Sequence, residues 1–302
     1  MPMHLFSITN NEEISVAAHR VLSEQYNLII DACSNQDSPH ESIHDTRKSY
    51  KRIRAVLRLI KPDISAEVYD REKRLLRELS GKFANARNLH VFAEEFDTIM
   101  KAGILKLPAT TENEIKSFFK EREEETLKIL LDLNLFEVVG KKNEEARDRV
   151  AAVDFSSLGP HTIYKGVSNV FAWGQKQMIH SQQFPTDDNL HEMRKRMKAL
   201  MYLVRLIKDV SPDFFNGYYK GLKSASLALG EDHNMAEMLN YIDTIGDEIL
   251  PEEEKKRIHE YITSQRQQIQ VDVWPLIAKL YTGQADEFSK RIKAYWLLGR
   301  QA

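Results

Sequence analysis

Apolar residues recur at three- and four-residue intervals along most of the chain, which is the period of an α-helix with one buried face. No segment shows the sustained apolar–polar alternation that is typical of a β-strand. The 302 residues include only 12 glycines and 9 prolines, and prolines stand at most of the interruptions of the helical pattern. The pattern therefore predicts an all-α protein.

The interruptions predict where each helix begins and ends. Pairs such as Ser38-Pro39 and Gly159-Pro160 suit the first turn of a helix, where the missing N–H of proline costs no hydrogen bond. The predicted helices are residues 11–33, 40–60, 65–84, 86–102, 111–132, 134–152, 160–182, 187–208, 212–229, 232–246, 250–281 and 284–300.

Two segments of the chain are copies of one another. The sequence HDTRKSYKRIRAVLRLIK begins at His44 and HEMRKRMKALMYLVRLIK begins at His191, with eight of eighteen positions identical at an offset of 147 residues. At an offset of 146, positions 74, 77, 84 and 88 also match positions 220, 223, 230 and 234 in character. We infer a duplication with halves at 1–155 and 156–302, and symmetry suggests two four-helix-bundle-like halves about a pseudo-two-fold axis.

Positive charge is concentrated in the repeated segments. Residues 44–87 hold 13 Lys/Arg against 6 Asp/Glu, and residues 191–223 hold 8 against 3. Because the whole chain has a net charge of -2, the remainder carries -2 - 7 - 5 = -14. A near-neutral pI of 6.6 disfavours a general nucleic-acid coating protein but is compatible with a local anion site.

Each repeated helix has a cationic face opposite an apolar one. At 100° per residue, Arg47, Lys48, Lys51 and Arg58 lie within about 60° of His44. The second copy places Arg194, Lys195, Lys198 and Arg205 around His191 in the same way. Like charges at this spacing repel one another, and a bound anion would relieve the repulsion.

The segment after each cationic helix adds a second row of basic and small residues. The first copy of this row is Arg74, Arg77, Gly81, Ala84 and Asn88, and the second is Lys220, Lys223, Leu227, Gly230 and Asn234. Arginine forks match phosphate oxygens and lysine supplies a mobile charge, so mixed rows suit a chain of phosphates. Simple helix packing explains the small residues equally well.

These motifs identify a family resemblance. H-x-x-R-x-x-x-K-R-x-R-x-x-x-R from His44 and H-x-x-R-K-x-x-K from His191 resemble the conserved histidine α-helical domain, CHAD. The resemblance implies two four-helix bundles about a pseudo-two-fold axis and a basic central surface that binds inorganic polyphosphate. Met201, Asn88 and Asn234 depart from the family pattern. The residues expected to bind polyphosphate are His44, Arg47, Lys48, Lys51, Arg52, Arg54, Arg58, Arg74, Arg77, Arg87, His191, Arg194, Lys195, Lys198, Arg205, Lys220 and Lys223.

Two alternatives remain: a nucleic-acid-binding helical module and a phosphate-ester or polyphosphate-processing enzyme. For catalysis, Asp45 and Glu192 point about 100° away from the cationic stripes, and no phosphate-loop or metalloprotease motif occurs. His40, His44 and His90 could meet as metal ligands, but we expect their cationic surroundings to repel a metal ion. We therefore expect a binding protein that has no catalytic residues, metal or cofactor.

The remaining residues bear on location and core. Cys33 is the only cysteine, so no disulfide forms within the chain, and neither a signal peptide nor a membrane-spanning apolar run is present. We expect a cytoplasmic protein that does not bind membranes, with association with polyphosphate granules as one option, while the oligomeric state stays open. We expect Trp173, Trp274 and Trp296 in the core or at bundle interfaces.

Overall fold

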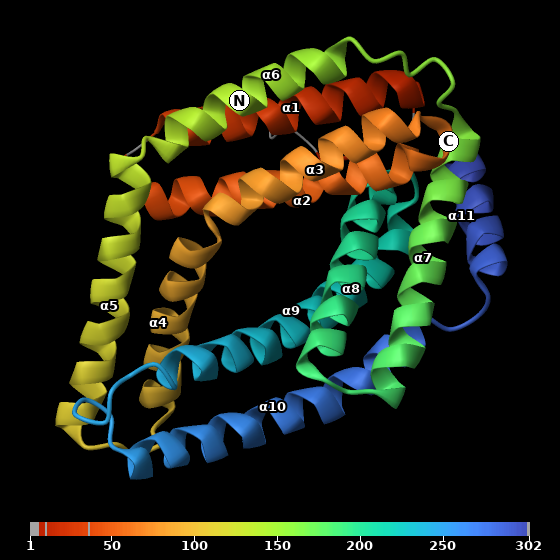
Figure 1. Cartoon of the computed structure of the whole chain (residues 1–302). Helices are drawn as coiled ribbons and strands as arrows, with labels where there is room; N and C mark the ends of the chain where they lie inside the picture. Colours follow the sequence, from red (N-terminus) through yellow and green to blue (C-terminus); the bar gives the residue numbers. More distant parts are fainter. Residues whose placement is uncertain (1–5, 10, 36, 301–302) are drawn as a thin grey trace.

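The computed structural model describes residues 6–9, 11–35 and 37–300, and all regular structure in these ranges is helical (Figure 1). The expected all-α fold is confirmed. The α-helices are α1 (Ile14–Ser34), α2 (Pro39–Ile60), α3 (Ala66–Lys82), α4 (Ala84–Ala102), α5 (Ala109–Asp132), α6 (Leu135–Ala151), α7 (Pro160–Gln183), α8 (Asp187–Ile207), α9 (Pro212–Ile242), α10 (Glu252–Leu280) and α11 (Ala285–Gly299).

One predicted interruption is wrong. The sequence predicted separate helices at 212–229 and 232–246, whereas α9 is continuous from Pro212 to Ile242. A glycine inside a helix costs only about 1 kcal/mol relative to alanine, which is too little to end a helix that buries one face along its whole length. Gly230 is buried within that face, so packing holds the helix through it.

The two repeated segments form α2 and α8 and end in the same way. A 3₁₀ turn follows each of them, Lys61–Asp63 after α2 and Lys208–Val210 after α8, at the repeat offset of 147 residues. The helices α2 and α8 also pack against each other. The cationic segments of the two sequence halves are therefore neighbours in the fold.

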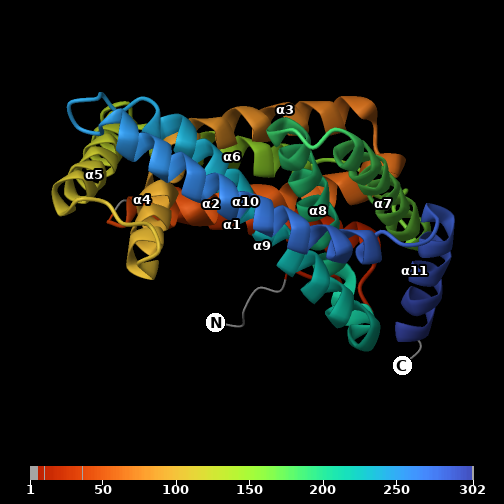
Figure 2. The same ribbon diagram turned by 90° about the horizontal axis from the view of Figure 1, so that it is seen from below.

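Two hydrophobic cores hold the molecule together. The larger lies around α1, α2, α6, α7, α8 and α11, and the smaller lies where α4 and α5 meet the second half of α9 and the first half of α10. Figures 1 and 2 show α4 and α5 at one side of the molecule and α11 at the opposite side. Both cores contain residues from either side of position 155, a position in the α6–α7 connection, so the division into two domains stays a prediction.

None of the helices in the described ranges is both long and apolar enough to cross a lipid bilayer.

A glycine lets α7 lie directly against α2. A Cβ atom at Gly166 would stand 2.2 Å from the carbonyl oxygen of Leu59. We expect Gly166→Ala to lower the free energy of unfolding by about 1–3 kcal/mol, because the helices must separate. Urea titration measures the change.

Gly217→Ala is the matched control: its Cβ meets open space, so the better helix propensity of alanine should leave stability equal or higher. A Gly166→Ala protein as stable as this control would contradict the packing argument.

Candidate polyanion-binding site

Five cations meet where α2 and α8 pack against each other. We call this set the crossing cluster: Arg47 and Lys51 of α2, Arg194 and Lys198 of α8, and Arg87 of α4. Burial, reinforced by the neighbouring Arg194 and Lys51, lowers the pKa of Lys198 to about 6. Burial together with Arg47 and Arg194 lowers the pKa of Lys51 to about 8. The expected convergence of charge from both sequence halves is thus present in the fold.

Backbone carbonyls, rather than carboxylates, hold Arg47 and Arg54 of α2. Nη1 of Arg47 donates to the carbonyl oxygen of Ser80 at 3.2 Å, and Nη2 of Arg54 donates to that of Leu76 at 2.7 Å and to the Ser80 hydroxyl. Both carbonyls lie in the C-terminal turns of α3, whose dipole favours a cation. Among the described residues, no ion pair joins a member of the crossing cluster to a carboxylate. The positive charge of the crossing cluster is therefore not taken up by an ion pair within the protein.

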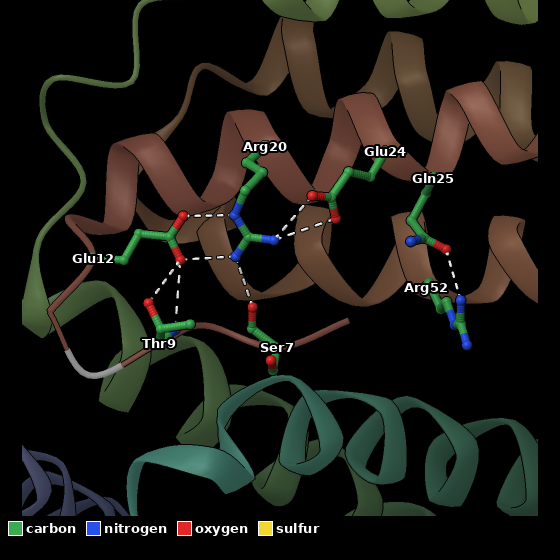
Figure 3. Close-up of polar contacts among 7 residues, drawn as sticks. All are labelled: Ser7, Thr9, Glu12, Arg20, Glu24, Gln25 and Arg52. Atoms are coloured by element: carbon green, nitrogen blue, oxygen red, sulfur yellow. Dashed lines mark hydrogen bonds and ion pairs between the residues drawn. The ribbon is translucent and has the colours of Figure 1, made fainter. Parts of the chain in front are cut away.

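Arg20 provides a contrast within the same molecule (Figure 3). Its guanidinium donates to Glu12 at 2.7 Å, to Glu24 at 3.2 Å and to the carbonyl oxygen of Ser7 at 2.8 Å. The hydrogen bond with Glu12 raises the pKa of Arg20. This arginine is neutralised locally and serves the fold, whereas burial lowers the pKa of Arg47 and Arg194, which form no ion pair, and the nearby Glu95 offsets the effect on Arg194 only in part.

The exposed lysines of the stripes have partners on their own helices. Lys48 Nζ lies 3.2 Å from Asp45, and Lys195 Nζ lies 2.6 Å from Glu192. Surface pairs of this kind contribute little and exchange readily with solvent ions. In the cationic stripes predicted from the sequence, the central cations therefore form no ion pair with a carboxylate, whereas the lysines at the outer edge do.

Beyond the crossing cluster the cations line a hollow that we call the basic cavity. Its volume is about 390 Å³, and its walls are Arg54, Leu57, Arg58, Tyr69, Lys73, Arg77, Trp173, Lys195 and Arg196. A neighbouring cavity of about 470 Å³ shares Arg58, Tyr69 and Trp173 and adds Lys61 and Lys176. No carboxylate lines either cavity. Arg54 links the basic cavity to the crossing cluster, because it also lowers the pKa of Lys51.

The family follows from the sequence match. The model of the CHAD domain matches residues 20–241, which span both basic helices and most of the chain. The chain belongs to the CHAD family. No curated protein sequence gives a significant match to this CHAD chain.

Solved structures show the same fold. The crystal structure of the CHAD domain from the plant Ricinus communis has a TM-score of 0.68 at 14% identity, covering 92% of this chain and 95% of that one. PptA from Streptomyces chartreusis has a TM-score of 0.64 at 12% identity, covering 90% of this chain and 100% of that one. At such low identity the likeness concerns the fold alone.

The sequence did not predict five residues that line the basic cavity of this CHAD chain, Leu57, Tyr69, Lys73, Trp173 and Arg196. The guanidinium of Arg196 lies 3.5 Å from the ring centre of Trp173, a close cation–π contact. Trp173 was expected in the core or at a bundle interface, but 44% of it is exposed, so a place in the core is wrong. Arg196 aligns with Ser49 in the first copy of the repeat, so it is not among the positions that the two copies share.

Besides His44, Lys48 and His191, five predicted residues lie outside the crossing cluster and the basic cavity. Arg52 is only 8% exposed and donates to Gln25 of α1 at 3.1 Å (Figure 3). Its guanidinium lies 5.4 Å from the Phe6 ring centre. Burial and its neighbour Arg205 lower its pKa, which places these two together. The remaining three are on α3 and α9 and are exposed: Arg74, which lines a small hollow beside Asp70, and Lys220 and Lys223.

The two histidines of the repeat have different surroundings. His44 is exposed, and its pKa is lowered by partial burial and by Arg87. His191 packs on His233 with ring centres 3.8 Å apart, and burial lowers its pKa to about 4. His191 is therefore neutral at pH 7 in the free protein, and Nδ1 of its ring is buried without a hydrogen-bond partner.

Residues of α4 and α9 complete the surroundings of Arg194. A Cβ atom at Gly230 would stand 3.3 Å from Nε of Arg194, so the small residue leaves room for the guanidinium. Glu95 is a nearby carboxyl that accepts a hydrogen bond from Asn234 at 3.1 Å. Burial raises the pKa of Glu95 to about 7, so near neutrality it neutralises Arg87 and Arg194 only in part.

Proposed function

We propose that this CHAD protein binds inorganic polyphosphate along the crossing cluster and the basic cavity. The observation that carries the proposal is the crossing cluster, in which partly buried cations from both halves gather without forming ion pairs to carboxylates. Holding these charges together is unfavourable in the free protein, and a polyanion that replaces the missing partners would repay the cost.

The arrangement suits an extended chain of phosphates better than a single phosphate ion. Cations continue from Arg87 through Lys51 and Lys198 to Arg54, and from there into the basic cavity at Arg77. Arginine and lysine both occur along this path, so forked and point-like donors are both available to successive phosphate groups.

The aromatic residue beside this path favours polyphosphate over RNA. Proteins that bind single-stranded nucleic acid usually stack bases on exposed aromatic rings. Trp173 is such a ring, but the guanidinium of Arg196 already covers one of its faces at 3.5 Å. The path therefore offers positive charge, but the Trp173 ring does not have both faces free for stacked bases.

We propose binding without chemical conversion of the ligand. The carboxylates next to the repeat histidines, Asp45 and Glu192, form ion pairs with Lys48 and Lys195 at 3.2 and 2.6 Å. A carboxylate that is paired with a lysine is a weaker general base. This supports a docking module for the polymer and not a hydrolase.

Competition between labelled polyphosphate and RNA of equal total charge tests the proposal. We expect unlabelled polyphosphate to displace the label at a concentration at least about tenfold lower than RNA, a difference of about 1.4 kcal/mol. Fluorescence anisotropy at fixed ionic strength measures both curves, because salt changes either affinity. Equal displacement by RNA would contradict the proposal and favour a nucleic-acid-binding module.

A further inference from the structure

Outside the crossing cluster, two histidines and a carboxylate meet at one point. Nδ1 of His90 lies 2.7 Å from Oε1 of Glu123, and Nε2 of His40 lies 3.3 Å from the same oxygen. The two imidazole rings stack with centres 4.3 Å apart. The potential ligand atoms of the three residues all lie within 4.8 Å of one another.

The three residues come from three helices that are distant in sequence. His40 is in the first turn of α2, His90 in α4 and Glu123 in α5. Two imidazole nitrogens that approach one carboxylate oxygen form a set of donors that zinc and related divalent transition metals prefer. Three protein ligands leave further coordination positions open for water or another donor.

The local charge favours a cation more than the sequence suggested. From the sequence, His44 is a potential metal ligand together with His40 and His90, in cationic surroundings that would repel a metal ion. In the structure Glu123 takes the place of His44, and Glu94 lies 3.6 Å from Nε2 of His90. These two carboxylates act on Arg87, the nearby cation of the crossing cluster, and offset its charge.

We propose that His40, His90 and Glu123 bind one divalent transition-metal ion, with Zn²⁺ as the best-fitting species. All three side chains are partly exposed, so the stacked rings can turn toward a shared ion. This site is separate from the polyphosphate proposal and does not depend on it.

A metal at this point would join the two cores. His40 belongs to α2, which packs in the larger core, while α4 and α5 build the smaller one. An ion that binds only the folded arrangement stabilises it by mass action. Zinc should therefore raise the melting temperature as well as bind.

Zinc titration of tag-free, metal-stripped protein in competition with a chromophoric chelator tests the site. We expect one ion per wild-type chain, an affinity lowered by roughly tenfold or more in His90→Ala and Glu123→Gln, and a zinc-dependent rise in melting temperature that both variants lose. Glu123→Gln keeps the side-chain size, and circular dichroism verifies the fold of each variant.

His259→Ala is the matched control, because His259 forms a similar exposed pair with Asp243 at 2.6 Å but lacks a second histidine. This variant should bind zinc and gain stability as the wild type does. The proposal is overturned if wild-type protein takes up no zinc at micromolar concentration, or if His90→Ala binds it as tightly and is stabilised as much as wild type.

Discussion

Affinity for long-chain polyphosphate should fall by at least about tenfold between pH 6.5 and pH 8.5. In the free protein the pKa of Lys198 is lowered to about 6 and that of Lys51 to about 8, first by burial and then by neighbouring cations. A bound phosphate chain favours the charged forms and raises both pKa values, so binding at higher pH must take up protons. Each pH unit above the free pKa costs up to about 1.4 kcal/mol per group.

Glu95 acts in the same direction. Burial raises the pKa of this carboxyl to about 7, so it gains negative charge over the same range, close to Arg194 and Arg87. Its ionisation weakens the attraction of the crossing cluster for a polyanion. The expected sign is thus shared by the three titrating groups, with tighter binding on the acidic side.

Calorimetric titration in two buffers of different ionisation enthalpy measures both the affinity and the protons taken up. Replacing both lysines by arginine, Lys51→Arg with Lys198→Arg, keeps the charge and should flatten the pH profile. The control pair Lys256→Arg with Lys290→Arg, at exposed lysines that pair with Glu260 and Asp286, should keep the wild-type slope. A wild-type affinity that does not change with pH would contradict the assigned role of the buried lysines.

The centre of the candidate site could be predicted because it is duplicated. Arg47 and Arg194 hold one repeat position, and Lys51 and Lys198 hold another, on helices whose opposite faces are apolar. Periodicity orients each stripe on its helix, and the repeat indicates that both stripes share one task. The packing of α2 on α8 then brings equivalent positions together.

Residues without a counterpart in the repeat could not be predicted in this way. Arg52 lies about 80° from His44 on the helical wheel, at the border of the stripe. Only the position of Gln25 on the neighbouring α1 decides that Arg52 points away from the basic cavity. Trp173 and Arg196 meet through the packing of α7 on α8, a long-range contact that no local pattern encodes.

Helix boundaries show a similar limit. Every predicted interruption marked by proline has a counterpart in the structure, because proline removes a backbone donor and restricts the residue before it. Gly230 carried no such constraint, and burial of the surrounding face kept α9 continuous. The meeting of His40, His90 and Glu123 likewise depends on how α2, α4 and α5 pack.

Removing the four cations of α2 and α8 in the crossing cluster should abolish most of the polyphosphate affinity. The variant combines Arg47→Ala, Lys51→Ala, Arg194→Ala and Lys198→Ala. We expect a loss of at least about tenfold, or 1.4 kcal/mol, because the phosphates lose their unneutralised partners while the acidic surroundings remain. The fold should persist, since burying these charges stabilises neither helix.

The matched control removes the same number of positive charges elsewhere. Lys101, Lys120, Lys256 and Lys290 are exposed on other helices, and each pairs with an acidic residue of its own helix. The fourfold alanine variant of these lysines has the same net charge as the variant that lacks Arg47, Lys51, Arg194 and Lys198, which we call the crossing variant. It should bind polyphosphate within about twofold of wild type, because surface pairs of this kind hold no ligand.

The most direct test is a calorimetric titration of polyphosphate into wild type, the crossing variant and the matched control at pH 7 and one ionic strength. Convergence of the two basic helices on a single phosphate chain predicts that only the crossing variant loses affinity, with its circular dichroism unchanged. Equal affinity in all three proteins, or equal losses in the two variants, would contradict it.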